Sequence, residues 1–234
     1  MKLGLLITFA AVSLSAQSAR KAVFISPDEL DIAAILPDPP ANDSAEMKRE
    51  LVELHRLQDT RSAGETARAK ADDAEEDIFV FRNVLGEGFS AQNLPATALL
   101  SMHLHNDEGQ ISNPAKNQFK RARPYQFDAG VKPVCAIKTT PDSYPSGHST
   151  TGYLEAFALA MMVPEKRELI LARADDYAHN RLVCGVHYAS DTVASKAVAY
   201  AMFAIIMQKP QFKQEFDAAQ QETRRALGLA ANSR

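Results

Sequence analysis

The chain has 234 residues, with 26 Lys and Arg against 29 Asp and Glu, and 46% of its residues are hydrophobic. This composition is that of an ordinary globular protein and excludes collagen-like, disulfide-dense and wholly disordered chains. The formal net charge of -3 gives no general attraction to nucleic acid or anionic lipid, so any anion site must be local.

The first nineteen residues have the features of an export signal. Lys2 precedes an apolar run at 3–14, and the small residues that follow allow cleavage after Ala16 or Ala19. The apolar run is shorter than the roughly 20 residues of a spanning helix, which favours cleavage over a membrane anchor. We therefore expect residues 1–19 to be a signal peptide and the mature protein to be periplasmic or secreted.

The rest of the chain is predicted to be helical. Residues 20–42 contain four prolines and are expected to be extended, because proline fixes φ and restricts the residue before it. Over 43–234, helical patterns meet no competing run of alternating β-branched residues, which predicts an all-α, single-domain helical bundle without repeats. Asp43 and Glu46 are placed as a helix cap and its reciprocal partner. The predicted helices span 44–77 with a break near Gly64, 94–106, 112–122, 149–162, 164–180, 191–208 and 210–227, and the predicted loops are 86–93, 107–111, 124–147 and 182–190.

In the chain after the signal, no segment is expected to span a membrane. The longest apolar stretch, 197–207, has eleven residues and predicts a buried core helix. The chain has two cysteines, Cys135 and Cys184, and an even pair in an exported protein is more often bridged than free. A bridge between them closes a loop of nearly fifty residues, for which the chain-entropy model gives about 4 kcal/mol.

Three segments concentrate polar residues that core packing does not require. Each is weak alone, because a single Lys or Arg on a helix is usually a solvated charge. In chain order they are Lys116-x6-Arg123-Pro124, then Pro145-Ser146-Gly147-His148, then Arg181-x5-His187-x3-Asp191.

The second and third segments each allow two interpretations. The second segment, which ends at His148, lies directly before a predicted helix, where backbone N–H groups attract anions, but Ser146 could equally cap the helix in an ordinary turn. His187 and Asp191 are four residues apart, so the carboxylate can fix the tautomer of the imidazole, or the pair can be a structural hydrogen bond.

Together, the three segments resemble the signature of the phosphatidic acid phosphatase and vanadium haloperoxidase superfamily. They occur in the same order, and twenty residues separate Pro124 from Pro145. With Tyr144 before the second segment, Cys184 within the third and the prolines at 35–40, the chain is similar to the bacterial class A non-specific acid phosphatases. This resemblance implies an all-α fold, a phosphomonoester substrate and a homodimer.

The resemblance also implies a role for each residue. His187 attacks phosphorus and forms a phosphohistidine, Asp191 orients it, and His148 protonates the leaving alcohol and then activates water. Neither a metal nor another cofactor is required. The groups expected to hold the phosphoryl oxygens are Lys116, Arg123, Ser146, Gly147 and Arg181.

One position departs from this family. Asn180 stands where the family usually has Ser before the Arg of the third segment. Because Asn also donates hydrogen bonds, we expect altered phosphate contact rather than lost activity.

Several other functions and sites are weighed against this one. A vanadate-dependent haloperoxidase would hold vanadate with the same residues, and a non-catalytic phosphoester-binding protein would need only the cations. His103 and His105 are two apart on a predicted helix and therefore point to different faces, which disfavours a metal pair. No partner is predicted for His55, and the acidic run at 72–77 is predicted to be a solvated helix face.

Overall fold

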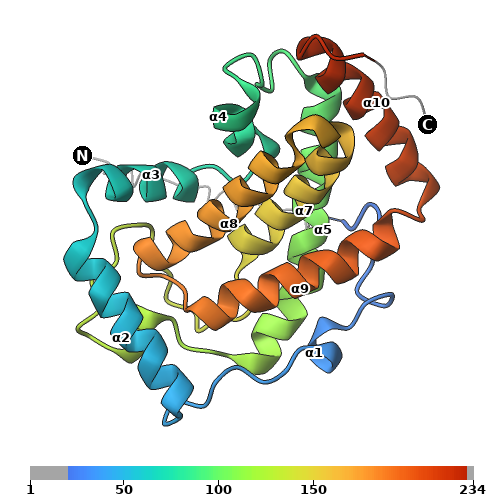
Figure 1. Ribbon diagram of the computed structural model, residues 1–234. Coiled ribbons are helices and arrows are strands. Elements are labelled where there is room, and N and C mark those ends of the chain that lie inside the picture. Colours follow the sequence, from blue (N-terminus) through green and yellow to red (C-terminus); the bar gives the residue numbers. More distant parts are fainter. Residues whose placement is uncertain (1–20, 231–234) are drawn as a thin grey trace, which may run out of the picture.

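The computed structural model describes residues 21–230, and every regular element in that range is helical, as predicted (Figure 1). The predicted signal peptide lies outside the described residues. The α-helices are α1 (Ile32–Ile35), α2 (Ala45–Thr60), α3 (Ala63–Asp73), α4 (Arg82–Leu85), α5 (Pro95–Phe119), α6 (Pro124–Phe127), α7 (Gly147–Met162), α8 (Arg167–Val183), α9 (Ala189–Ile206) and α10 (Pro210–Ala226), with single 3-10 turns η1 (Ile78–Phe81) and η2 (Pro164–Lys166).

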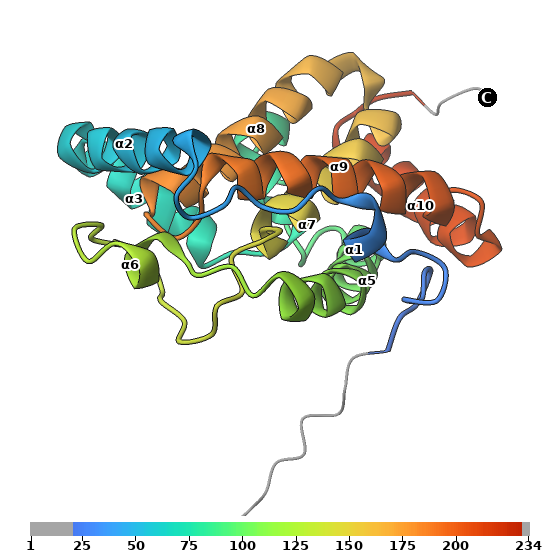
Figure 2. The same cartoon turned by 90° about the horizontal axis from the view of Figure 1, so that it is seen from below.

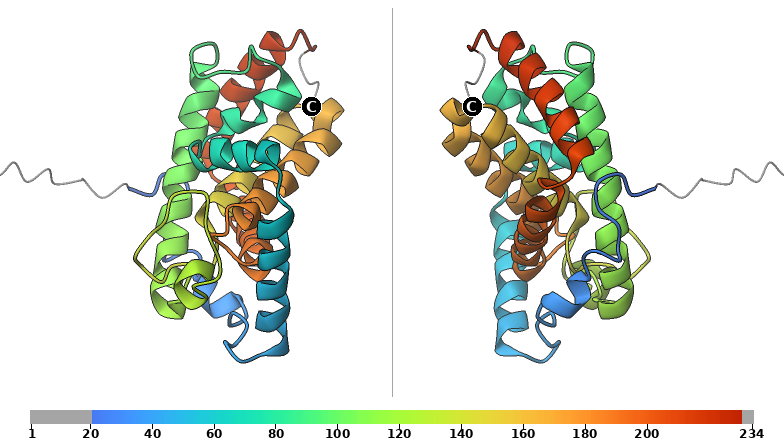
Figure 3. Two further views of the ribbon diagram at one scale, coloured as in Figure 1. Left: turned by 90° about the vertical axis from the view of Figure 1, so that its left-hand side faces the viewer. Right: turned by 90° about the vertical axis from the view of Figure 1, so that its right-hand side faces the viewer.

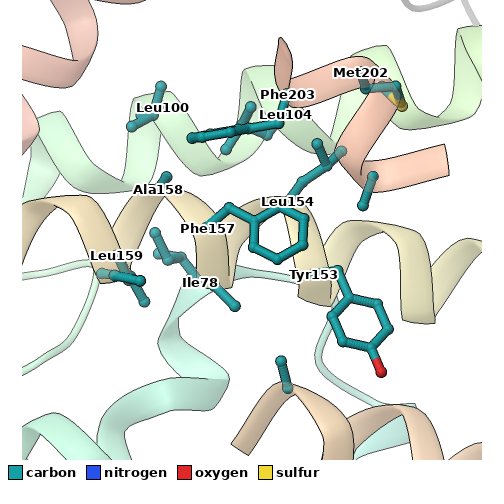
Figure 4. Close-up of a cluster of buried hydrophobic side chains, with 14 of the residues drawn as sticks. Ile78, Leu100, Leu104, Tyr153, Leu154, Phe157, Ala158, Leu159, Met202 and Phe203 are labelled. Atoms are coloured by element: carbon teal, nitrogen blue, oxygen red, sulfur yellow. The ribbon is translucent and has the colours of Figure 1, made fainter. Parts of the chain in front are cut away.

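Helix α7 forms the centre of the bundle and packs against α5, α8 and α9. Nearly all of its residues are buried, as expected for a helix that is apolar on every side. In Figure 4, Leu154 and Phe157 of α7 lie among side chains of α5 and α9. Gly152 allows the Tyr177 ring of α8 to lie directly on α7, because a Cβ at this position would come within 2.7 Å of the ring.

Glu155 of α7 is an acid buried among these apolar side chains. The Ser101 hydroxyl of α5 donates to Glu155 of α7 at 2.6 Å and accepts from the Ile78 N–H at 3.0 Å. Burial raises the pKa of Glu155 well above its ordinary value, which favours its neutral form, and the Ser101 hydroxyl links α7, α5 and η1 by hydrogen bonds.

Helix α5 is continuous, and the loop predicted at 107–111 is wrong. The polar residues that indicated a loop turn inward: Asp107 and Glu108 are both buried on α5. The Asp107 carboxylate accepts the N–H groups of Val23, Phe24 and Ile25 at 2.6, 2.8 and 3.1 Å, which fastens the N-terminal segment to this helix. The polar residues at 107–111 therefore mark a contact with the N-terminal segment and not an interruption of the helix.

The long helix predicted at 44–77 is two helices, and the break precedes Gly64. Ser62 caps α3 by accepting from the Glu65 N–H, and Glu65 in return accepts the Ser62 N–H at 2.8 Å. This reciprocal cap ends α2 at Thr60 and places Gly64 inside α3. The cap of α2 is Ser44, whose hydroxyl accepts from the third helical residue, and not Asp43 as predicted.

The predicted extended segment 20–42 contains the single turn α1 and otherwise has no regular structure over its described part. Its Pro37 carbonyl accepts from the Tyr144 hydroxyl at 3.0 Å, which joins it to the loop after α6. The predicted disulfide is present: Cys135 of that loop is bonded to Cys184 at the end of α8, 49 residues later in the chain. Figures 2 and 3 show the loop that contains α6 extending from the carboxyl end of α5 along one side of the bundle.

Among the described helices, α9 alone is long and apolar enough to cross a membrane. Half of it is buried in the bundle, and its packing against α7 and α8 is that of the predicted core helix.

Candidate active site

The three polar segments meet at one end of the bundle, although 64 residues separate Lys116 from Arg181. Lys116 comes from the last turn of α5, Arg181 from the last turn of α8, and His187 from the turn between α8 and α9. The second segment starts α7. Buried residues of the site are Lys116, Arg123, Ser146, Arg181, His187 and Asp191, while Gly147 and His148 are half-buried.

The two ring nitrogens of His187 have opposite partners. Its Nδ1 lies 3.1 Å from the Asp191 carboxylate, and its Nε2 lies 3.1 Å from a guanidinium nitrogen of Arg123. The carboxylate can only accept and the guanidinium can only donate, so Nδ1 carries the proton and Nε2 keeps a lone pair. Burial, followed by the charges of Arg123, Arg181 and Lys116, lowers the pKa of His187 well below its ordinary value. His187 is therefore neutral, with Nε2 facing the cations.

Asp191 is held by more groups than His187 alone. Its carboxylate accepts from the Ser143 hydroxyl at 2.6 Å and from the Tyr188 N–H at 2.9 Å, the latter as a cap at the start of α9. Burial raises the pKa of Asp191, and Arg121, 2.6 Å away, is the largest opposing charge. The carboxylate thus has a fixed orientation toward His187.

Arg121 and Glu50 are members of this network that the sequence analysis missed. Arg121 is buried, lies 2.8 Å from the Glu50 carboxylate and covers the Tyr188 ring at 4.0 Å. Glu50 also accepts the Ser190 N–H at 2.6 Å. One signal was available: Glu50 shares a face of α2 with the buried apolar residues, of which Met47 is three residues before it. Nothing in the sequence distinguished Arg121 from a solvated cation.

Lys116 and Arg123 are fixed by the loop after α6. The Lys116 ammonium donates to the carbonyls of Pro145 at 2.5 Å and Asp142 at 3.1 Å, and burial lowers its pKa to about 8. Arg123 donates through Nε to the Asp142 carboxylate at 2.7 Å and through a terminal nitrogen to the Val186 carbonyl at 3.1 Å. Arg123 thereby reaches Nε2 of His187, and Lys116 lies near enough for its charge to lower the pKa of that ring.

Arg181 is bound on one side only. One terminal nitrogen lies 2.6 Å from the Asp73 carboxylate, while its Nε is buried without a hydrogen-bond partner in the part of the chain that the structure describes. A buried unpaired donor beside two further cations is the arrangement an anion would complete. The amide of the neighbouring Asn180, the position where we expect altered phosphate contact, donates to Asp72 at 2.7 Å.

The start of α7 combines the two interpretations of the second segment. Ser146 is the N-cap of α7, and its hydroxyl oxygen accepts from Ser149. Gly147 is the first helical residue, and a Cβ there would lie in ordinary van der Waals contact, 3.4 Å from the buried Glu108 carboxylate. The capping turn and an anion-attracting helix N-terminus therefore occur at the same place.

The acidic run 72–77 is not the predicted solvated helix face. The chain turns inward between α3 and η1, where Asp77 caps η1 by accepting from the Phe79 N–H at 2.8 Å. The other acids pair with cations of the bundle and the site: Asp72 with Arg173, Asp73 with Arg181, Glu75 with Arg82, and Glu76 with His148.

Two histidines outside the site contact carboxylates. His103 lies 2.8 Å from Glu215 and His55 lies 2.8 Å from Asp128, so His55 has a partner that the sequence did not reveal. Over residues 21–230, one group of potential metal-ligand atoms lies close together, that of Asp73 and the two cysteines. Both sulfurs of that group are bonded to each other in the disulfide and are not thiolates.

Comparisons with known proteins agree with this geometry. The family model of the PAP2 superfamily matches residues 95–215. A non-specific acid phosphatase of Providencia stuartii is 30% identical over 207 residues, covering 82% of this chain and 81% of the relative. A non-specific acid phosphatase of Salmonella typhi is 26% identical over 208 residues, covering 85% and 83%.

A solved structure supports the fold. The crystal structure of a transmembrane PAP2-type phosphatidylglycerolphosphate phosphatase from Bacillus subtilis superposes with a TM-score of 0.53 at 15% identity, covering 79% of this chain and 91% of that one. From the matched family model, the relatives and the convergence of the three segments on one buried site, the chain belongs to the PAP2 superfamily, as a relative of its non-specific acid phosphatases.

Proposed function

We propose that this protein is an exported acid phosphatase that hydrolyses phosphomonoesters through a phosphohistidine on His187. The observation that carries the proposal is the environment of this one ring. Asp191 fixes the proton on Nδ1, and Arg123 lies 3.1 Å from Nε2, so the lone pair of a neutral imidazole faces a cationic pocket. A phosphoryl group in that pocket would lie in line for attack by Nε2.

The reaction has two steps in this proposal. Nε2 of His187 attacks phosphorus, the ester P–O bond breaks, and His148 gives its proton to the departing alcohol oxygen. Water then attacks phosphorus while neutral His148 takes a proton from it, the N–P bond breaks, and inorganic phosphate leaves. An alcohol in place of water would give phosphotransfer as a side activity.

Five groups would hold the phosphoryl oxygens. Lys116, Arg123 and Arg181 supply positive charge, and the Ser146 hydroxyl and Gly147 N–H supply neutral donors. Charge that spreads over the equatorial oxygens is stabilised by such fixed donors, so the mechanism needs no metal. The unpaired Nε of Arg181 supports this assignment.

An acid pH optimum follows from the same site. Burial, followed by the charge of Arg181, lowers the pKa of His148, so acid conditions favour the protonated ring that the first step needs. Export is supported by the disulfide between Cys135 and Cys184, because such bonds persist in oxidising compartments.

The test is hydrolysis of p-nitrophenyl phosphate by the mature protein from about pH 4 to pH 8 with a chelator present, beside His187→Ala and the control His55→Ala. We expect chelator-resistant turnover that is lost in His187→Ala and retained in His55→Ala, whose ring pairs with Asp128 outside the site. An alkaline quench with radiolabelled substrate should trap the phosphoenzyme in the wild type. Unchanged hydrolysis by His187→Ala would reject the nucleophile, and an inactive wild type would favour a binding protein or a haloperoxidase.

A further inference from the structure

The turn between α3 and η1 places a carboxylate on the second histidine of the site. Nδ1 of His148 lies 2.5 Å from the Glu76 carboxylate, and Nε2 lies 3.2 Å from the Asp73 carbonyl. The His148 side chain is 18% exposed, and the Glu76 carboxylate takes the place of solvent at its Nδ1. Glu76 belongs to the acidic run for which the sequence predicted only a solvated face.

The partners of the two site histidines favour opposite protonation states. His148 faces a carboxylate and a carbonyl, both of which only accept, so it satisfies them with two N–H groups, as an imidazolium. His187 faces the acceptor Asp191 on one side and the donor Arg123 on the other, which suits a neutral ring. Environments that separate two histidines in this way divide the roles of acid and nucleophile between them.

The charged and titratable groups around His148 act in both directions. Burial and then Arg181 of α8 lower its pKa, while the hydrogen bond and charge of Glu76 and the Asp73 carbonyl raise it. The ring of Tyr177, also on α8, stacks at 6.3 Å between ring centroids, and the neutral His187 completes the surroundings. Among these groups Glu76 is the one that supports the charged form through a side-chain contact.

Glu76 itself is suited to remain ionised in acid. Although burial raises its pKa, the hydrogen bond and charge of His148, followed by the charges of His105 and Arg181, lower it to about 2. The carboxylate therefore stays negative over the acid range in which the enzyme is proposed to work.

We propose that Glu76 is a positioning residue that holds His148 as the imidazolium through Nδ1, so that the Nε2 proton passes from the Asp73 carbonyl to the leaving alcohol when substrate is bound. This inference rests on the proposed function, in which His148 is the general acid. When Nε2 transfers its proton, the ring keeps Nδ1–H on Glu76 and becomes neutral, which prepares it to accept a proton from water in the second step.

The test compares Glu76→Gln with the wild type on two substrates that differ in leaving group. p-Nitrophenolate leaves readily without a proton, whereas the alkoxide of glycerol 2-phosphate does not, so only the second substrate depends strongly on the acid. We expect the alkaline limb of the kcat profile to move down by about one pH unit, as loss of a neighbouring opposite charge predicts. The loss of kcat/KM on glycerol 2-phosphate should be at least about tenfold greater than on p-nitrophenyl phosphate.

Two further variants separate this role from a structural one. Glu76→Asp keeps the charge and should return the alkaline limb of the kcat profile to its wild-type position. Glu75→Gln removes a charge from the adjacent residue, which pairs with Arg82 and not with His148, and should leave the limb in place. An unmoved limb in Glu76→Gln, or an equal loss on both substrates, would overturn the inference.

A His148→Ala variant shows which proposal has failed. If it hydrolyses glycerol 2-phosphate as well as the wild type does, the proposed acid is wrong, and the role of Glu76 falls with it. If it loses that activity while Glu76→Gln keeps the wild-type profile, only the inference about Glu76 is wrong.

Discussion

Replacing Arg121 with Met should destabilise the protein more than any other single loss of charge in the site network. Arg121 lies between two carboxylates, 2.6 Å from Asp191 and 2.8 Å from Glu50, and its side chain is 4% exposed. Methionine retains much of the volume over the Tyr188 ring but leaves both acids buried without their cation. Removing one partner of a buried ion pair costs about 3–5 kcal/mol. For a protein of this size that is a fall in Tm of about 10 °C.

The loss of stability in Arg121→Met should depend on pH. Without Arg121 the pKa of Asp191, already raised by burial, rises further in the folded state. A carboxyl whose folded pKa lies above its unfolded value lowers stability once the pH exceeds the unfolded value, so the deficit grows as pH rises. The Tm deficit of Arg121→Met should therefore be larger at pH 7 than at pH 4.5.

Differential scanning calorimetry of three variants checks this reasoning. Arg121→Lys keeps a charge and should lose less than Arg121→Met. Arg56→Met is the matched control, because Arg56 makes a similar two-bond pair with Glu53 on the surface of α2 and should give no resolvable change. A Tm loss in Arg121→Met no larger than that of the control, or one equal at both pH values, would refute the argument.

Two further stability predictions concern the core and the loop after α6. Glu155→Gln should raise Tm at pH 7 by at least about 3 °C and by less at pH 4. The folded pKa of Glu155 is raised, so folding at a pH above the unfolded pKa must protonate this carboxyl, and glutamine avoids that cost. An equal gain at both pH values would contradict this. Removing the 49-residue cross-link with Cys135→Ser and Cys184→Ser should cost about 4 kcal/mol, or roughly 8–16 °C in Tm. The Tm of the wild type treated with reductant should approach the Tm of that variant. A wild-type Tm that does not change with reductant would contradict the expected contribution of the disulfide to stability.

Local patterns were sufficient for α7 and α9, the helices that consist of nearly continuous apolar runs. The predicted helix at 149–162 begins two residues late, and the predicted one at 191–208 is shifted by two residues from α9. Where a polar residue had a tertiary partner, the same reasoning failed. Asp107 indicated a loop because its partners, the N–H groups of the N-terminal segment, are more than 80 residues away in the chain.

The sequence by itself determined the all-α class, the pair of cysteines that is bridged and the three segments that meet in the site. It did so because helical periodicity and motif spacing are local properties of the chain. Tertiary structure alone decided how those segments are supported. Arg121 and Glu50 are 71 residues apart, and Glu76 and His148 are 72 residues apart, so no spacing rule joins either pair. Whether a charged side chain is solvated or buried against an opposite charge depends on packing between helices, and that packing turned an apparent surface run at 72–77 into part of the site.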